Sequence, residues 1–190
     1  MTDADSSRLV PVIAADGGAR SPVHSGTNQY DTPGADPMTR LVADADVLAA
    51  DLLVGGASRK AVDLAHAHDW VDLVASAPLL ADAEAVIADL AGADLAAGWR
   101  ARIEDLAVLV DHPEGDHPAL AAALHGDARH VLSLDERLQS AGAGAAIRRE
   151  ADVEASVRSP DAFVRLFDPA GVYEAIHGEP YPGPDRDRRP

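Results

Sequence analysis

Short apolar runs that alternate with longer amphipathic segments, from Leu41 onward, limit most strongly what this chain can fold into. The amphipathic segments are long enough for helices, and the apolar runs have the length of buried strands. Strands that alternate with helices form a mostly parallel sheet with helices on both faces. We therefore expect an α/β fold of three layers, α/β/α, with about five strands, at residues 41–45, 70–76, 107–113, 130–134 and 153–160.

Glycine and proline mark the expected helix boundaries. The helical pattern from Val47 to His68 is interrupted at Gly55-Gly56, which predicts two helices. Pro78 suits the first turn of the next helix. Further helices are expected after these, at 94–106, at 116–126 with a high alanine content, at 135–141, and at 161–167 and 170–178.

The regular pattern covers only part of the chain. Residues 1–37 lack sustained periodicity and are rich in Gly, Ser, Pro and Asp, so we expect a disordered extension. Met38 opens a segment that resembles a natural protein start, and 38–178 is the expected domain. Residues 179–190 are expected to form a polar tail. No apolar stretch approaches the roughly 20 residues that span a bilayer, so we expect no membrane segment and a cytoplasmic location.

The charge balance points to a salt-rich cytoplasm. The formal net charge is -16, and Lys60 is the only lysine. Dense carboxylates, scarce lysine and abundant alanine are typical of halophilic proteins, and they exclude a conventional basic nucleic-acid binder. Because the Debye length is roughly 3 Å at 1 M salt, acidity alone does not exclude a polyanionic substrate.

Carboxylates follow several of the expected strands. Asp44 and Asp46 end the first strand, Asp116 opens the helix after the third, and Asp135 follows the fourth. The carboxyl ends of parallel strands lie at one edge, where α/β proteins bind ligands. Mg²⁺ and Mn²⁺ prefer oxygen ligands, so this edge is a predicted divalent-metal site.

These motifs resemble those of the PIN-domain family of metal-dependent nucleases, over nearly all of 41–168. The matching segments are Asp44-Ala45-Asp46-Val47-Leu48, Asp82 in SAPLLAD, Asp116 in DHPALAAAL, and Ser133-Leu134-Asp135. Asp46 stands where that family usually has Asn. The family more often has Glu in the second motif, so Glu84 competes with Asp82. A helix places these two about 200° apart, and only one can face the site.

The resemblance implies hydrolysis of phosphodiesters, with RNA as the favoured substrate and Mg²⁺ or Mn²⁺ as cofactor. It implies Asp44, Asp82, Asp116 and Asp135 as catalytic metal ligands, with Ser133 and Asp46 orienting them. Arg137 lies two residues after Asp135 and could reach a phosphate. Possible partners are a second copy of the chain and a small protein.

Other interpretations remain open from the sequence. The same fold could be a catalytically inactive binding or scaffold domain, since Asp116 and Asp135 are also placed like helix N-caps. Asp44-Ala45-Asp46 also resembles the first motif of haloacid-dehalogenase-type phosphatases, with Asp44 as nucleophile. That family needs a cation beside the phosphate, and Lys60 lies in the wrong region. His112 and His117 flank a turn and indicate a surface loop rather than a zinc site.

Overall fold

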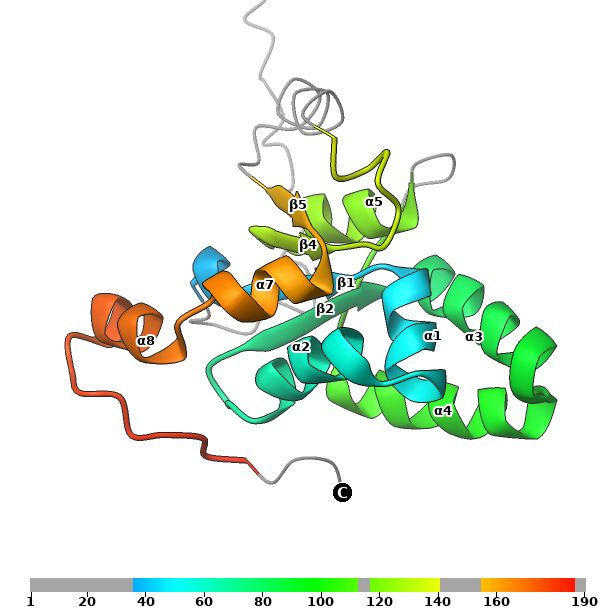
Figure 1. The fold of residues 1–190 in the computed structure, drawn as a ribbon, viewed down its shortest axis with the longest axis horizontal. Coiled ribbons are helices and arrows are strands. Elements are labelled where there is room, and N and C mark those ends of the chain that lie inside the picture. The colour runs from blue at the N-terminus through cyan, green and yellow to red at the C-terminus, as the bar shows by residue number, and fades with distance from the viewer. Residues whose placement is uncertain (1–35, 113–116, 141–154, 187–190) are drawn as a thin grey trace, which may run out of the picture.

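The computed structural model describes residues 36–112, 117–140 and 155–186. Residues 1–35 of the extension expected at 1–37, and the candidate ligand Asp116, lie outside these residues. Of the last two residues of that extension, Asp36 caps a short 3-10 helix and Pro37 begins it. The described part has five strands in one sheet, all parallel, in the order β3-β2-β1-β4-β5. The mostly parallel α/β prediction is confirmed (Figure 1). The strands are β1 (Arg40–Ala43), β2 (Asp72–Ser76), β3 (Val108–Val110), β4 (His130–Leu132) and β5 (Ser156–Arg158).

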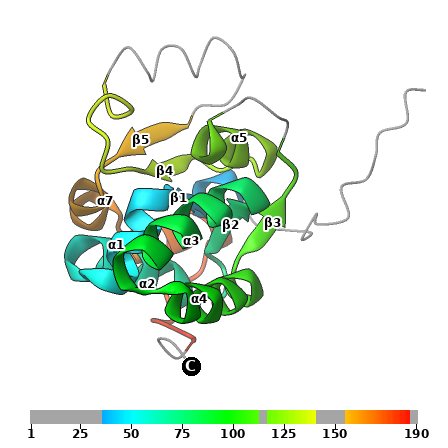
Figure 2. The same cartoon turned by 90° about the vertical axis from the view of Figure 1, so that its right-hand side faces the viewer.

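Helices cover both faces of the sheet. A short 3-10 helix, η1 (Pro37–Thr39), precedes β1. Figure 2 shows α5 on one face and α1, α2, α3, α4 and α7 on the other, which gives three layers. The helices are α1 (Ala45–Leu53), α2 (Gly56–His66), α3 (Ala77–Ala91), α4 (Ala93–Leu106), α5 (Pro118–His125), α7 (Pro160–Leu166) and α8 (Pro169–His177). None of the helices in the described ranges is long and apolar enough to cross a membrane.

Local sequence signals account for most helix ends. Gly55 and Gly56 have φ of 78° and 63°, a left-handed backbone that glycine adopts readily, and they separate α1 from α2 as expected. Ser76 caps α3 by accepting a hydrogen bond from the Leu79 amide at 3.4 Å, and Pro78 lies in its first turn. Ser159 caps α7 in the same way, with Ala162 as donor at 3.2 Å.

The expected helix at 135–141 is wrong over the residues described. Residues 136–139 form turns instead, held by a bond from the Gln139 amide to the Asp135 carbonyl at 3.2 Å and one from the Ser140 amide to the Arg137 carbonyl at 3.3 Å. The segment after β4 therefore stays close to the end of the strand, because its polar groups bond back to the strand end.

A second difference concerns α5, which has His117 at its N-cap position, without a side-chain cap.

The C-terminal segment packs on the domain. The amides of Asp185 and Arg186 donate to the Ala67 carbonyl at 3.0 and 3.2 Å, after α2. The Tyr181 hydroxyl is hydrogen-bonded to His68, and its ring contacts Trp70. Residues 181–186, expected as part of a polar tail, thus contribute aromatic and backbone contacts beside β2.

Candidate functional site

The strand order reverses at the carboxyl ends of β1 and β4, and we call this edge the carboxylate crevice. From β1 the chain builds β2 and β3 on one side, and it then returns to build β4 and β5 on the other. In open parallel sheets, ligands bind where the strand order reverses in this way. Asp44 and Asp46 follow β1, and Ser133 and Asp135 follow β4, so the structure brings these four predicted residues to the expected edge.

Asp44 is held by two hydrogen bonds at the start of α1. Its Oδ1 accepts from the Ala45 amide at 2.8 Å, and its Oδ2 accepts from the Ser133 hydroxyl at 3.0 Å. The residue is 9% exposed. Burying a carboxylate is costly unless it is hydrogen-bonded, and these two donors fix its orientation at the crevice.

Ser133 joins the two strand ends. It is fully buried, and while its hydroxyl donates to Asp44, its oxygen accepts from the Asp135 amide at 3.0 Å. Gln139 Nε2 donates to the Ser133 carbonyl at 2.8 Å, which ties the following turns to the same point. The sequence-based role of Ser133 as an orienting residue is consistent with these contacts.

Asp46 has one carboxylate oxygen bonded and one without a hydrogen bond of good geometry. Its Oδ2 accepts from the Leu134 amide at 3.0 Å, which links α1 to the segment after β4. Its Oδ1 is buried and accepts no hydrogen bond of good geometry from the described residues, although the Val47 amide lies close enough to lower the pKa of the carboxyl slightly. Burial raises the pKa of the Asp46 carboxyl, and the charges of Asp44 and, to a smaller extent, Asp135 raise it further.

Asp135 is paired with Arg137. The guanidinium donates to Asp135 through Nε at 3.1 Å and through Nη2 at 2.9 Å, and the Arg137 amide donates to Oδ1 at 2.8 Å. The side-chain hydrogen bond from Arg137 is the main reason that the pKa of Asp135 is lowered. Arg137 is itself 91% exposed. The predicted phosphate-binding arginine is thus engaged with a predicted metal ligand.

The remaining predicted ligands are not brought into this group. Asp82 is exposed on α3. Glu84 faces α4, where its carboxylate lies 3.6 Å from the Arg100 guanidinium. Within the described ranges, no group of three or more His, Asp or Glu side chains is placed to hold a metal ion. The structure therefore brings neither of the two competing residues of α3 to the carboxylates at the strand ends.

Sequence reasoning missed the part played by the Leu134 backbone. In the segment Ser133-Leu134-Asp135 only the two flanking side chains were given a role, whereas the Leu134 amide anchors Asp46. Every non-proline residue carries such a donor, so the side-chain pattern holds no signal for it.

The donor set suits a hard cation. All side-chain groups at the strand ends offer oxygen, and Mg²⁺ or Mn²⁺ is bound by a few carboxylates together with water. The buried Asp46 Oδ1, which accepts no hydrogen bond of good geometry from the described residues, has the chemistry of a metal-binding oxygen. Asp44 and Asp46 fit this role most directly.

A family model described as "Family of unknown function (DUF7384)" matches residues 35–189. The chain belongs to this DUF7384 family. No curated protein and no solved structure matches the chain. The match includes the whole described domain and residues 181–186, which pack beside β2.

The resemblance to the PIN-domain family is corrected by this result. The motifs at Asp44, Asp82 and Ser133-Leu134-Asp135 suggested that family, but the family matched is DUF7384 and no PIN-domain match accompanies it. Short motifs of Asp and small residues carry little information in a chain with 32 acidic residues. Any function of this DUF7384 protein therefore has to be argued from its own geometry.

Replacing Asp46 by Asn is expected to raise the free energy of unfolding at pH 7. Since the folded state binds the Asp46 proton more tightly than the unfolded chain, stability falls as pH rises from 3.8 through the raised pKa. Asn cannot ionise, and its amide oxygen can keep the Leu134 hydrogen bond. Urea unfolding from pH 3.5 to 8 should show the difference between variant and wild type growing through that window and staying constant above it.

The control is Asp105→Asn, which removes an exposed carboxylate of α4. It should leave this pH-dependent difference near zero. A gain for Asp46→Asn that is already complete at pH 3.5 would contradict the electrostatic explanation.

Proposed function

We propose that this DUF7384 protein hydrolyses phosphodiester bonds with a divalent metal ion, with RNA as the favoured substrate, in a salt-rich cytoplasm. The observation that carries the proposal is the buried Oδ1 of Asp46, which accepts no hydrogen bond of good geometry from the described residues and lies near two further carboxylates. The position of these groups at the reversal of strand order supports it.

Asp44 and Asp46 would hold the metal ion, with Asp135 as a further ligand. Asp116, which the sequence also predicts as a ligand, is proposed to complete the set. Mg²⁺ or Mn²⁺ supplies an activated water and stabilises the leaving oxygen of a phosphodiester. Ser133 holds Asp44 and the backbone of Asp135 in fixed positions, so the chain's own contribution is to orient the carboxylates before the ion binds.

Arg137 would contribute to substrate binding. Its pairing with Asp135 is exposed, and exposed ion pairs are worth little, so the guanidinium can exchange partners. If Asp135 were to bind a metal ion, the guanidinium would be available for a phosphate oxygen, which it could bind through two N–H groups. In molar salt, such a short-range contact matters more than long-range attraction.

A second candidate function is binding without catalysis. Two observations favour it: the described residues contain no group of three metal-ligating side chains, and Asp135 is neutralised by Arg137. In that case the ordered strand ends would form a rigid contact surface for a partner. The phosphatase reading has less support, because both oxygens of Asp44 accept hydrogen bonds and the side chain is 9% exposed, whereas a nucleophile must reach substrate.

Thermal melting with and without Mn²⁺ tests metal binding directly. At a Mn²⁺ concentration of about 100 times Kd, binding stabilises the folded state by about 2.7 kcal/mol. For a domain of this size, that raises Tm by about 5–10 °C. The measurement should be made in 2 M KCl, to reproduce a salt-rich environment. High salt also suppresses non-specific binding to the acidic surface, because the Debye length is only about 3 Å at 1 M salt.

Asp46→Asn and Asp105→Asn are the matched variants for this melt. The first should remove most of the Mn²⁺ effect, and the second should keep it. A Tm that Mn²⁺ leaves unchanged in the wild type would favour the binding function over the hydrolase.

A further inference from the structure

A cavity of about 290 Å³ opens between α1, α2 and α4, away from the carboxylate crevice. Apolar side chains form much of its wall, namely Leu52, Leu95, Trp99, Ile103 and Leu106. Ligand pockets commonly have volumes of about 300–1,000 Å³. This cavity is at the lower end of that range, so it suits a molecule of one or two rings.

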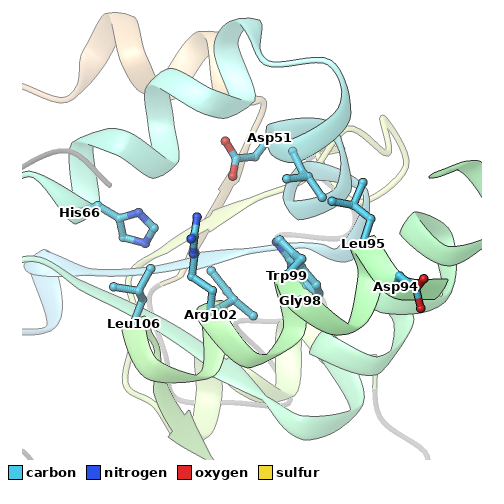
Figure 3. Close-up of a pocket in the computed structure, with 10 residues that line it drawn as sticks. Asp51, His66, Asp94, Leu95, Gly98, Trp99, Arg102 and Leu106 are labelled. Carbon is cyan, nitrogen blue, oxygen red and sulfur yellow. The ribbon is translucent and has the colours of Figure 1, made fainter. Parts of the chain in front are cut away.

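Gly98 contributes to the opening of this cavity. It lies inside α4, where glycine costs about 1 kcal/mol relative to alanine. A Cβ built at this position meets no atom within 4 Å, so close packing does not require glycine here. Trp99, the next residue, also lines the cavity and is 8% exposed (Figure 3).

Arg102 lines the cavity and makes no ion pair within the described ranges. Figure 3 shows its side chain rising from α4 into the space between His66 and Asp51. Asp51 is 4% exposed, and its carboxylate is already 3.5 Å from Arg59, whose guanidinium also donates to the Asp51 and Leu52 carbonyls. Asp94 points away from these side chains in the same view.

Although Asp51 and Asp94 both line the cavity, the exposed guanidinium of Arg102 offers a local binding place for an anion. The buried carboxylate is balanced by Arg59, while the guanidinium of Arg102 has no partner for its donors among the described residues. Guanidinium groups bind carboxylate, sulfonate and phosphate oxygens through pairs of N–H groups. An anion that also carries a flat apolar ring would use both Arg102 and the apolar wall around Trp99.

We propose that this cavity binds a small aromatic anion, with its ring against Trp99 and its charged group on Arg102. The site is independent of the proposed hydrolysis. Asp51 lies seven residues beyond Asp44, which corresponds to roughly 10 Å along α1. Loss of either function would therefore leave the other measurable.

Isothermal titration calorimetry of the full chain in 1 M KCl tests the proposal with three probes of the same ring system. These are naphthalene-1-sulfonate, neutral 1-naphthalenemethanol and the cation 1-naphthylmethylammonium. The sulfonate should bind most tightly. Arg102→Gln should weaken its binding about tenfold, as expected for loss of a hydrogen bond to a charged group, and should leave the alcohol nearly unchanged.

Two further variants identify the cavity as the site. Gly98→Leu places a side chain at the opening and should abolish binding of both the sulfonate and the alcohol. Arg165→Gln removes an exposed arginine of α7, which is ion-paired with Asp161, and should have no effect. Circular dichroism should show the same fold for all variants.

Three results would overturn the proposal. The first is no heat of binding with the sulfonate at concentrations up to about 1 mM. The second is tighter binding of the ammonium probe than of the sulfonate. The third is sulfonate binding that Arg102→Gln leaves unchanged. The second result would assign the site to Asp51 and to cationic ligands instead.

Discussion

Replacing Asp44 by Asn is expected to lower Mn²⁺-dependent cleavage of single-stranded RNA by about 100-fold or more, equal to about 2.7 kcal/mol of transition-state stabilisation. The reason is the loss of one negative charge at the proposed metal site, where the ion supplies several kcal/mol. Asn keeps an oxygen that can accept from the Ala45 amide, so the cap of α1 can persist, while its amide NH2 replaces the oxygen that accepts from the Ser133 hydroxyl. Initial rates with a labelled RNA in molar KCl measure the effect.

Comparison with Asp105→Asn and Ser133→Ala makes this prediction specific. Asp105 is exposed on α4, and its replacement should leave the rate unchanged. Ser133→Ala removes the group that positions Asp44 and Asp135, so its rate should fall less than that of Asp44→Asn and recover in part at higher Mn²⁺. Equal cleavage by wild type and Asp44→Asn would show that the carboxylate crevice is not the active site.

Replacing Gly126 by Ala is expected to destabilise the domain by about 1–3 kcal/mol, as is usual for overpacked positions. Gly126 follows α5 and faces β2. A Cβ there would overlap Val74 Cγ1 and lie 2.9 Å from the Ala122 carbonyl oxygen. Val74 is buried and the carbonyl belongs to helix backbone, so neither can move freely. Urea unfolding should show a lower midpoint with an unchanged m-value.

Gly98→Ala is the matched control, with the opposite sign. Its new methyl group meets no atom within 4 Å, and alanine favours the helix, so stability should rise by about 0.5–1 kcal/mol. Combining Gly126→Ala with Val74→Ala should restore part of the packing but not the contact with the Ala122 carbonyl. If Gly126→Ala proves as stable as the wild type, α5 does not pack against β2 as closely as described.

The fold could be predicted because its signals are local and repeated. Apolar runs of strand length, amphipathic segments between them, and breaks such as Gly55-Gly56 together specify five parallel strands and their helices. Each signal reflects burial of one face or the backbone freedom of glycine. The helix expected at 135–141 failed because Asp135, Arg137 and Gln139 bond to one another and to Ser133, which favours turns.

The candidate site was predicted only in part. The arrival of Asp44, Asp46, Ser133 and Asp135 at one edge follows from the parallel direction of the strands, which the alternation of elements indicates, whereas the adjacency of β1 and β4 is known only from the structure. Family membership did not follow, because carboxylates at strand ends occur by chance in so acidic a chain, and the PIN-domain resemblance was wrong. The partners of Glu84 and Arg137 also depend on which neighbours the packed helices and turns bring near.

The sequence by itself determined the parallel α/β fold and the edge at which its carboxylates gather, since hydrophobic periodicity and chain direction are written along the chain. Only the tertiary structure decided that Asp46 keeps a buried oxygen with no hydrogen bond of good geometry from the described residues, that Ser133 joins two strand ends, and that Arg102 projects into an apolar cavity. Hydrogen bonding and desolvation act over a few ångströms between residues far apart in sequence. Their outcome is therefore set by packing rather than by local pattern.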